Sequence, residues 1–358
     1  MKTTYLLKSE LLKGGLPLAT PLWLAPLAGV TTPPFREFFT QLGASLTHTE
    51  MVSCAGLVRG NRRTLEMLQV LPTEAPVVLQ LFTGEADLMV RGAEAALALT
   101  ASGKAGPFAA LGLNMACPMP KVTKRGAGAA LLSSPETAFR MTREVRSLGL
   151  PVWVKMRRLA EDDRTMEFVE GLLRAGADNV CIHGRTAAQR YEGRADRQVV
   201  LDAARRFPEK ISASGDVREF EDIREYLEGG CVGVMLARGA LADPWLFPGA
   251  LALLGCSVSP DLAAPSPAER FERLASLGER AKSLVGERQA VLMLKHLTFG
   301  LLRGINGAAE LRCRAGCSKT LEELLKVFQV GALQSLEDKH VSASVEWKGE
   351  EMGRKGIS

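Results

Sequence analysis

A single thiol follows an apolar run in the first half of the chain. Cys117 stands in the segment Asn114-Met115-Ala116-Cys117-Pro118, directly behind the apolar residues 108–113. Loops at strand ends carry catalytic residues out of proportion to their number, and a protonated thiol can serve as a general acid. Free cysteine is also among the most often buried residue types, so an inert core thiol is the alternative interpretation. Cys117 is therefore a candidate catalytic residue.

Polar residues and glycines end seven apolar segments of this chain. They are Glu50, Gln80, Asn114, Lys155, His183, Gly215 with Asp216, and Arg238. One or two such residues could fall there by chance. A set drawn from seven segments is better explained as the lining of one pocket, because the carboxyl ends of the strands form the active-site face of a parallel barrel.

Eight short apolar segments, often rich in β-branched residues, are the candidate strands. They span residues 22–25, 45–49, 76–81, 108–113, 151–156, 179–182, 210–214 and 232–236. Helical patterns lie between them at 34–42, 85–99, 135–148, 166–175, 198–206 and 220–228. Ser134 is positioned to cap one of these helices, and Gly176 to end another. Eight alternations predict an α/β fold, a (β/α)8 TIM barrel, rather than a doubly wound sheet.

The C-terminal part has a different pattern. Prolines at 260, 265 and 267 indicate a linker, and residues 268–285, 289–303 and 320–330 have apolar residues at helical spacing. We expect a barrel domain over residues 1–250, a small helical domain over 255–335, and a disordered polar tail over 342–358.

Composition limits the class of protein. The chain has 358 residues, 46% of them hydrophobic, with a formal net charge of +5. No apolar run is long enough for a membrane span or a signal sequence, and the seven scattered cysteines favour reduced thiols over disulfides. We expect a cytoplasmic protein, a monomer, without a metal site.

Several motifs together resemble the tRNA-dihydrouridine synthases of the bacterial type, over residues 20–330. The motifs are Ala25-Pro26-Leu27-Ala28-Gly29, Gln80, Asn114 to Pro118, Lys155-Met156-Arg157, His183-Gly184-Arg185-Thr186, Ser214-Gly215-Asp216 and Ala237-Arg238. The family usually has Gly where Ala116 and Ala237 stand and Asn where Ser214 stands. None of these departures removes a group that the chemistry needs.

The resemblance implies FMN as cofactor, NADPH as reductant and uridine in tRNA as substrate. It also implies that the barrel over 1–250 is the FMN-binding catalytic domain and that the helical domain over 255–335 binds the tRNA. Hydride would pass from the flavin to C6 and a proton from Cys117 to C5 of the uracil. The implied cofactor-binding residues are Pro26, Leu27, Ala28, Gln80, Lys155, His183, Ser214, Gly215, Asp216, Ala237 and Arg238. Asn114 and Arg185 would bind the substrate. Lys155 can place a positive charge near the flavin N1 and O2 edge, and Arg238 can pair with the phosphate.

Basic residues are concentrated after the candidate strands. They are Arg59, Arg62, Arg63, Lys121, Lys124, Arg125, Arg157, Arg158, Arg190 and Arg194. Solvated surface charges are the ordinary interpretation. Their place on the rim of the predicted pocket favours instead a surface for a phosphate backbone.

Other classes of protein share some of these residues. A flavin barrel acting on a free small molecule, such as a dihydroorotate-like substrate, would share the cofactor residues but would need neither the rim arginines nor the helical domain. A class I aldolase would use Lys155 as a Schiff base. A non-catalytic RNA-binding protein would need neither Cys117 nor Lys155. The sequence does not identify which uridine is reduced, or whether NADPH or NADH is preferred.

Overall fold

The structure is a computed structural model that describes residues 12–13, 15–302 and 307–332. The predicted tail over 342–358 lies outside these residues. Contacts between Cα atoms divide the chain into two compact units, one over residues 1–240 with 244–258, the other over 241–243 with 259–358. Within the described residues, no helix is both long enough and apolar enough to span a bilayer.

The first unit is a parallel barrel, as predicted. Its sheet runs in the order β3-β11-β10-β9-β8-β7-β6-β4, and β5 pairs with β6. A bridge between Trp23 and Leu46, with a hydrogen bond from Leu24 N–H to the Leu46 carbonyl (2.9 Å), joins the two ends. The strands are β3 (Leu22–Leu24), β4 (Thr47–His48), β5 (Val52–Ser53), β6 (Val77–Phe82), β7 (Ala110–Met115), β8 (Val152–Arg157), β9 (Asn179–His183), β10 (Ile211–Ser214) and β11 (Val234–Leu236).

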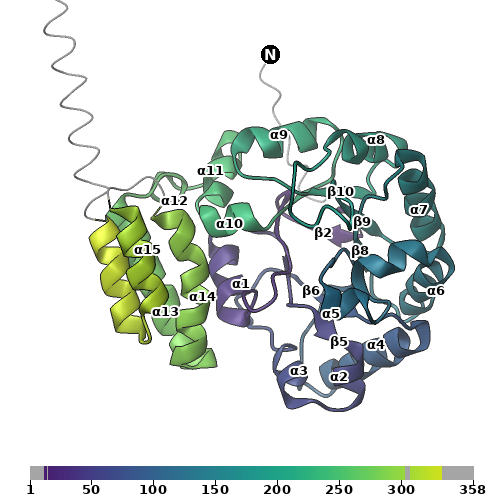
Figure 1. Cartoon of the computed structure of the whole chain (residues 1–358), viewed down its shortest axis with the longest axis horizontal. Coiled ribbons are helices and arrows are strands. Elements are labelled where there is room, and N and C mark those ends of the chain that lie inside the picture. Colours follow the sequence, from purple (N-terminus) through teal and green to yellow (C-terminus); the bar gives the residue numbers. More distant parts are fainter. Residues whose placement is uncertain (1–11, 14, 303–306, 333–358) are drawn as a thin grey trace, which may run out of the picture. The chain divides into compact units, whose positions relative to one another are not determined.

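Helices follow the strands and cover the outside of the barrel (Figure 1). They are α1 (Pro33–Gln41), α2 (Cys54–Val58), α3 (Arg62–Glu66), α4 (Ala86–Ala101), α5 (Pro120–Thr123), η1 (Gly128–Ser133), α6 (Pro135–Arg146), α7 (Asp162–Arg174), α8 (Gln198–Arg206), α9 (Phe220–Glu228), α10 (Arg238–Ala242) and α11 (Leu246–Leu253). All six predicted helices of this unit are present. The strands between them are apolar on both faces, because helices cover one face and the barrel interior the other.

The helix ends agree with the sequence in one case and differ in another. Gly176, just past α7, has a φ of +100°, a backbone conformation that favours glycine. Ser134 stands at the start of α6, but its side chain makes no capping hydrogen bond. Its φ and ψ of −135° and 68° lie outside the usual range for a cap. The prediction that Ser134 caps α6 is therefore wrong, and Pro135 at the first helical position remains the start signal.

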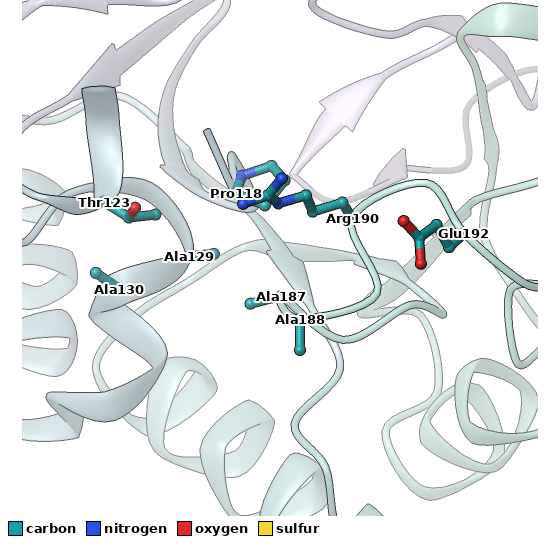
Figure 2. Close-up of a pocket in the computed structure, with 8 residues that line it drawn as sticks. All are labelled: Pro118, Thr123, Ala129, Ala130, Ala187, Ala188, Arg190 and Glu192. Carbon is teal, nitrogen blue, oxygen red and sulfur yellow. The ribbon is translucent and has the colours of Figure 1, made fainter. Parts of the chain in front are cut away.

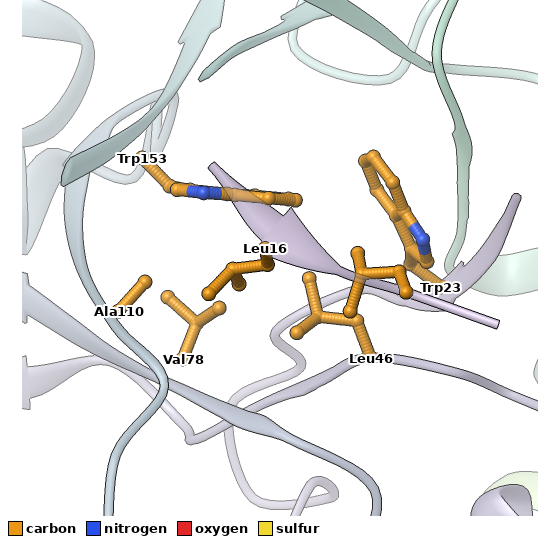
Figure 3. Close-up of a cluster of buried hydrophobic side chains, with 7 residues drawn as sticks. Leu16, Trp23, Leu46, Val78, Ala110 and Trp153 are labelled. Carbon is orange, nitrogen blue, oxygen red and sulfur yellow. The ribbon is translucent and has the colours of Figure 1, made fainter. Parts of the chain in front are cut away.

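A cluster of apolar side chains fills the barrel interior at the beginning of the strands (Figure 3). The indole rings of Trp23 and Trp153 lie 4.8 Å apart between centroids. Leu16 packs against them from the short hairpin of β1 (Leu12–Lys13) and β2 (Leu16–Pro17). Because this end is packed with side chains, the polar residues two positions further along the strands lie toward the other end.

The second unit is helical. It contains α12 (Pro260–Ala263), α13 (Pro267–Val285), α14 (Glu287–Leu301), α15 (Ala308–Cys317) and a helix over 321–332. Ser266 and Glu269 form a capping box at the start of α13, and Gly286, with a φ of +84°, separates α13 from α14. The sequence predicted three of these helices and missed α12 and α15.

Candidate functional site

A cavity of about 270 Å³ lies where the barrel strands end. Most of the residues singled out from the sequence line it together: Pro26, Leu27, Ala28, Cys117, Lys155, His183, Ser214, Gly215, Asp216, Ala237 and Arg238. They come from the ends of six strands. The strand register is the cause, because it sets Asn114 beside Lys155, Arg157 beside His183, and His183 beside Ser214.

Gln80 and Asn114 lie behind the cavity wall. Both are buried, and the Asn114 amide donates to Gln80 Oε1 at 2.9 Å. Asn114 Oδ1 accepts hydrogen bonds from the backbone N–H groups of Ala116 (3.1 Å) and Cys117 (3.0 Å). The described contacts of Asn114 are therefore with the loop that carries the thiol.

The carbonyl side of the Cys117 loop is fixed by a glycine. Ala129 N–H donates to the Cys117 carbonyl at 3.0 Å. Gly128, next to Ala129, has a φ of +62°, and a Cβ added there would lie 2.6 Å from that carbonyl oxygen. Only glycine suits both the conformation and the space. Held from both sides, Cys117 is partly exposed and lines the cavity.

Lys155 brings a cation into the barrel mouth. Its ammonium donates to Ser214 Oγ at 3.3 Å. Burial lowers the pKa of Lys155, and the nearby Arg157 adds to that effect. No described carboxylate makes an ion pair with this ammonium. A partly buried cation whose one described partner is a hydroxyl can interact with negative charge on a bound molecule.

Arg157 was missed as a pocket residue. We predict it among the basic residues of the rim that bind a phosphate backbone, but its side chain is buried and lines the cavity. Its guanidinium donates to the carbonyls of Ala116 (2.8 Å) and Thr186 (2.9 Å), joining the loops after β7 and β9. The spacing held the signal, because residues 155 and 157 share one face of a strand.

His183 is a neutral imidazole. Its pKa falls from 6.5 to about 2, chiefly through burial and then through the cations of Lys155, Arg157 and Arg185. Nδ1 accepts a hydrogen bond from the Arg185 backbone N–H at 3.2 Å, so Nε2 carries the proton. A donor at Nε2 is therefore present on the cavity side near Gly215.

Arg185 lies outside the cavity, bound to Asp216. Its guanidinium donates to both carboxylate oxygens of Asp216, at 2.8 and 2.6 Å, and to the carbonyls of Glu192 and Gly193. Burial alone would raise the pKa of Asp216, but the hydrogen bond from Arg185 and the charges of Arg185 and Arg238 bring it below its usual value. The pair anchors the loop after β9 to the end of β10.

Tyr191 belongs to the motif that follows β9 but is not among the predicted site residues. Its ring is 55% exposed and lines the cavity. The guanidinium groups of Arg157 and Arg238 lie 5.6 and 5.0 Å from its centroid. Such cation–π contacts hold an aromatic side chain in place at a surface where it would otherwise move.

The fold agrees with that of a solved barrel protein. The crystal structure of TcOYE with pHBA superposes with a TM-score of 0.51 at 12% identity, covering 74% of this chain and 97% of that chain. At this identity the similarity concerns the fold alone.

Sequence relatives are more informative. The probable tRNA-dihydrouridine synthase 1 of Synechocystis sp. is 32% identical over 342 residues, which cover 92% of this chain and 89% of the relative. The probable tRNA-dihydrouridine synthase of Mycobacterium tuberculosis is 31% identical over 328 residues, covering 87% and 82%. That of Treponema pallidum is 34% identical over 247 residues, covering 65% and 71%. The family profile described as "Dihydrouridine synthase (Dus)" matches residues 23–337. The chain therefore belongs to the dihydrouridine synthase family.

Proposed function

We propose that this protein reduces uridine in tRNA to 5,6-dihydrouridine, with FMN as its cofactor and NADPH as the reductant. The observation that carries the proposal is the joint presence of the Cys117 thiol and the Lys155 ammonium in one cavity of a family member. The reaction needs a proton donor, and a cation suits the charge that grows on a reduced flavin.

The residues of the cavity fit a flavin mononucleotide. Lys155 supplies a positive charge that its single described partner, Ser214, does not neutralise. At the other end Gly215 and Gly239 leave backbone walls: a Cβ at Gly239 would lie 2.1 Å from the Val217 carbonyl. A phosphate can approach such walls closely, and Arg238 beside them can pair with it. His183 Nε2–H adds a neutral donor between the two ends.

The uracil C5=C6 bond is conjugated to the C4 carbonyl, which makes C6 the electrophilic carbon. When bound and reduced, the flavin supplies the hydride that adds at C6. Cys117 then transfers its thiol proton to C5 of the resulting enolate and is left as a thiolate, which takes a proton from water. Asn114 and Arg157 hold the loop that presents the thiol.

The exposed residues around the cavity suit an RNA substrate. Lys121, Lys124 and Arg125 lie in and directly after α5, in the segment that follows Cys117, and are exposed. A uridine that is stacked inside folded tRNA must be turned out to reach a cavity at the end of a barrel. Basic side chains at the mouth would bind the phosphates on either side of it.

The experiment is the reduction of unmodified tRNA by the purified protein. We expect absorption bands near roughly 370 and 450 nm from bound flavin, and dihydrouridine in the tRNA after addition of NADPH. A protein that stays colourless after incubation with FMN would contradict the cofactor assignment. A yellow protein that oxidises NADPH with a dihydroorotate-like acceptor but leaves tRNA unchanged would favour the small-molecule alternative.

A further inference from the structure

A second cavity, of about 390 Å³, adjoins the first (Figure 2). Pro118, the residue after Cys117, lines both cavities. The second cavity is open to solvent, and its volume exceeds the roughly 300 Å³ at which small-molecule sites begin. None of the chemistry proposed above uses it.

Two loops form the walls of this cavity. Thr123 and Ala129 come from the segment after β7, and Ala187, Arg190 and Glu192 from the segment after β9. The alanine side chains are too small to fill the space between the loops, so a flat group can lie against them. The charged residues of the lining, Arg190 and Glu192, are then the two groups that can select a ligand.

Arg190 is held in an uncommon backbone conformation. Its φ is +48°, a left-handed conformation that is uncommon for a residue other than glycine. Two turns impose it, through hydrogen bonds from Arg190 N–H to the Ala187 carbonyl (3.3 Å) and from Glu192 N–H to the Gln189 carbonyl (2.7 Å). Arg185, itself bound to Asp216, holds the Glu192 carbonyl at 3.0 Å. The loop is thus fixed from behind, while its charged side chains are exposed.

Arg190 is also a free cation. Two other arginines of the same face are paired, Arg185 with Asp216 and Arg158 with Asp162. No acidic side chain among the described residues pairs with Arg190. An unpaired guanidinium that lines a cavity is suited to a phosphate group.

We propose that this second cavity binds the nucleotide next to the target uridine, with Arg190 on its phosphate and Glu192 accepting a hydrogen bond from its ribose 2′-hydroxyl. The inference rests on the proposed function, because a uridine in the first cavity brings its covalently linked neighbour past Pro118. The ribose phosphate of a nicotinamide reductant has the same chemistry. RNA is favoured because the loop that supplies Thr123 also carries Lys121, Lys124 and Arg125, which extend the positive surface beyond one nucleotide.

The test compares uridine monophosphate with the dinucleotides UpA and ApU as competitors of labelled tRNA. We expect the wild-type protein to bind at least one dinucleotide about 10-fold more tightly than the mononucleotide. Arg190→Ala should abolish this gain. Arg224→Ala removes the same charge from an exposed position on α9, away from the cavity, and should keep the gain. Arg190→Gly also removes the charge, but glycine adopts the left-handed backbone without strain. It should lose the gain as Arg190→Ala does, which shows that the lost charge and not a distorted loop is the cause.

The hydroxyl is tested with the matching deoxy dinucleotide. Replacing the neighbour's 2′-hydroxyl by hydrogen should weaken binding to the wild-type protein several-fold and leave binding to Glu192→Ala unchanged. Equal competition by mono- and dinucleotides, in a protein that still reduces tRNA, would overturn this inference alone. An Arg190→Ala variant with a raised KM for NADPH in the absence of RNA, and normal dinucleotide binding, would assign the cavity to the reductant instead. No reduction of tRNA by the wild-type protein would overturn the proposed function and this inference with it.

Discussion

Asn114 holds the backbone of Cys117 through its side-chain oxygen, which accepts the Cys117 N–H at 3.0 Å. The same oxygen accepts the Ala116 N–H, and the amide nitrogen is bound to Gln80. The three described hydrogen bonds of this amide are all made within the protein, and two of them hold the loop that carries the thiol.

Asn114→Ala should therefore free the Cys117 loop. We expect kcat for uridine reduction to fall about 10-fold or more, because a misplaced proton donor slows the proton transfer more than it weakens substrate binding. The flavin absorption spectrum should be retained. Asn114→Asp keeps the acceptor oxygen beside Lys155 and should lose less. Equal activity of Asn114→Ala and wild type would remove this positioning role.

Cys117→Ala removes the proposed proton donor without touching the cofactor residues. The variant should remain yellow and oxidise NADPH, yet reduce uridine about 10²-fold more slowly. Cys313→Ala, at an exposed cysteine of the helical unit, is the control and should be unaffected. Normal dihydrouridine formation by Cys117→Ala would exclude the thiol from the reaction.

His48 makes the barrel sensitive to acid. Burial lowers its pKa from 6.5 to about 4, and its Nδ1 donates to the Leu24 carbonyl at 2.8 Å. Between these pH values the unfolded chain binds a proton that the folded chain does not, so the free energy of unfolding falls as the pH falls. The slope from this one group approaches about 1.4 kcal/mol per pH unit.

His48→Gln should lessen that acid dependence, because glutamine can donate to the same carbonyl but does not titrate. Urea midpoints at pH 7, 6 and 5 measure the effect. The difference in urea midpoint between the variant and the wild-type protein should be smaller at pH 5 than at pH 7. If the urea midpoints of the two proteins fall equally with pH, a group other than His48 causes the acid dependence.

Binding of tRNA should depend steeply on salt, because each neutralised phosphate releases counterions. Charge reversal at Lys124 and Arg125 should raise the tRNA dissociation constant about 10-fold or more and leave NADPH oxidation intact. Arg174→Glu, on α7, is the control, since its charge lies on a helix and pairs with Glu170. If tRNA binding depends neither on the salt concentration nor on the charge reversals at Lys124 and Arg125, a small-molecule substrate is favoured.

The barrel could be predicted because most strands are short apolar segments that end in a polar residue or a glycine. Each of the eight predicted strands and six predicted helices of the first unit has a counterpart within a few residues of its expected bounds, since periodicity and end signals act locally. The short elements β5, α2, α3, α5, η1, α10 and α11 were not predicted. The helical unit was predicted less completely. In α15, which the sequence reading missed, only Leu311 and Ala315 are buried, so no continuous apolar stripe marked the helix.

The cavity wall could be predicted only in part. Residues at strand ends follow from strand positions, but the direction of a long side chain depends on its partners. Arg157 turns inward because two loop carbonyls accept its hydrogen bonds, and Arg185 turns away from the cavity because Asp216 binds it. The strand spacing places Arg157 on the same face as Lys155, but the partners that fix each guanidinium are distant in the sequence, so the direction of the two side chains could not be predicted from local pattern. The exposure of Tyr191 between two arginines is likewise set by contacts across the barrel mouth.

The tryptophan cluster at the closed end of the barrel bears on the order of events in catalysis. With Trp23 and Trp153 packed beneath Lys155, both reactants must reach the cavity from the strand-end side. If the proposed reductant and uridine share this one entrance, each must leave before the other can enter. Initial-rate plots at several fixed concentrations of the second substrate should consequently be parallel lines, the pattern of a double-displacement enzyme.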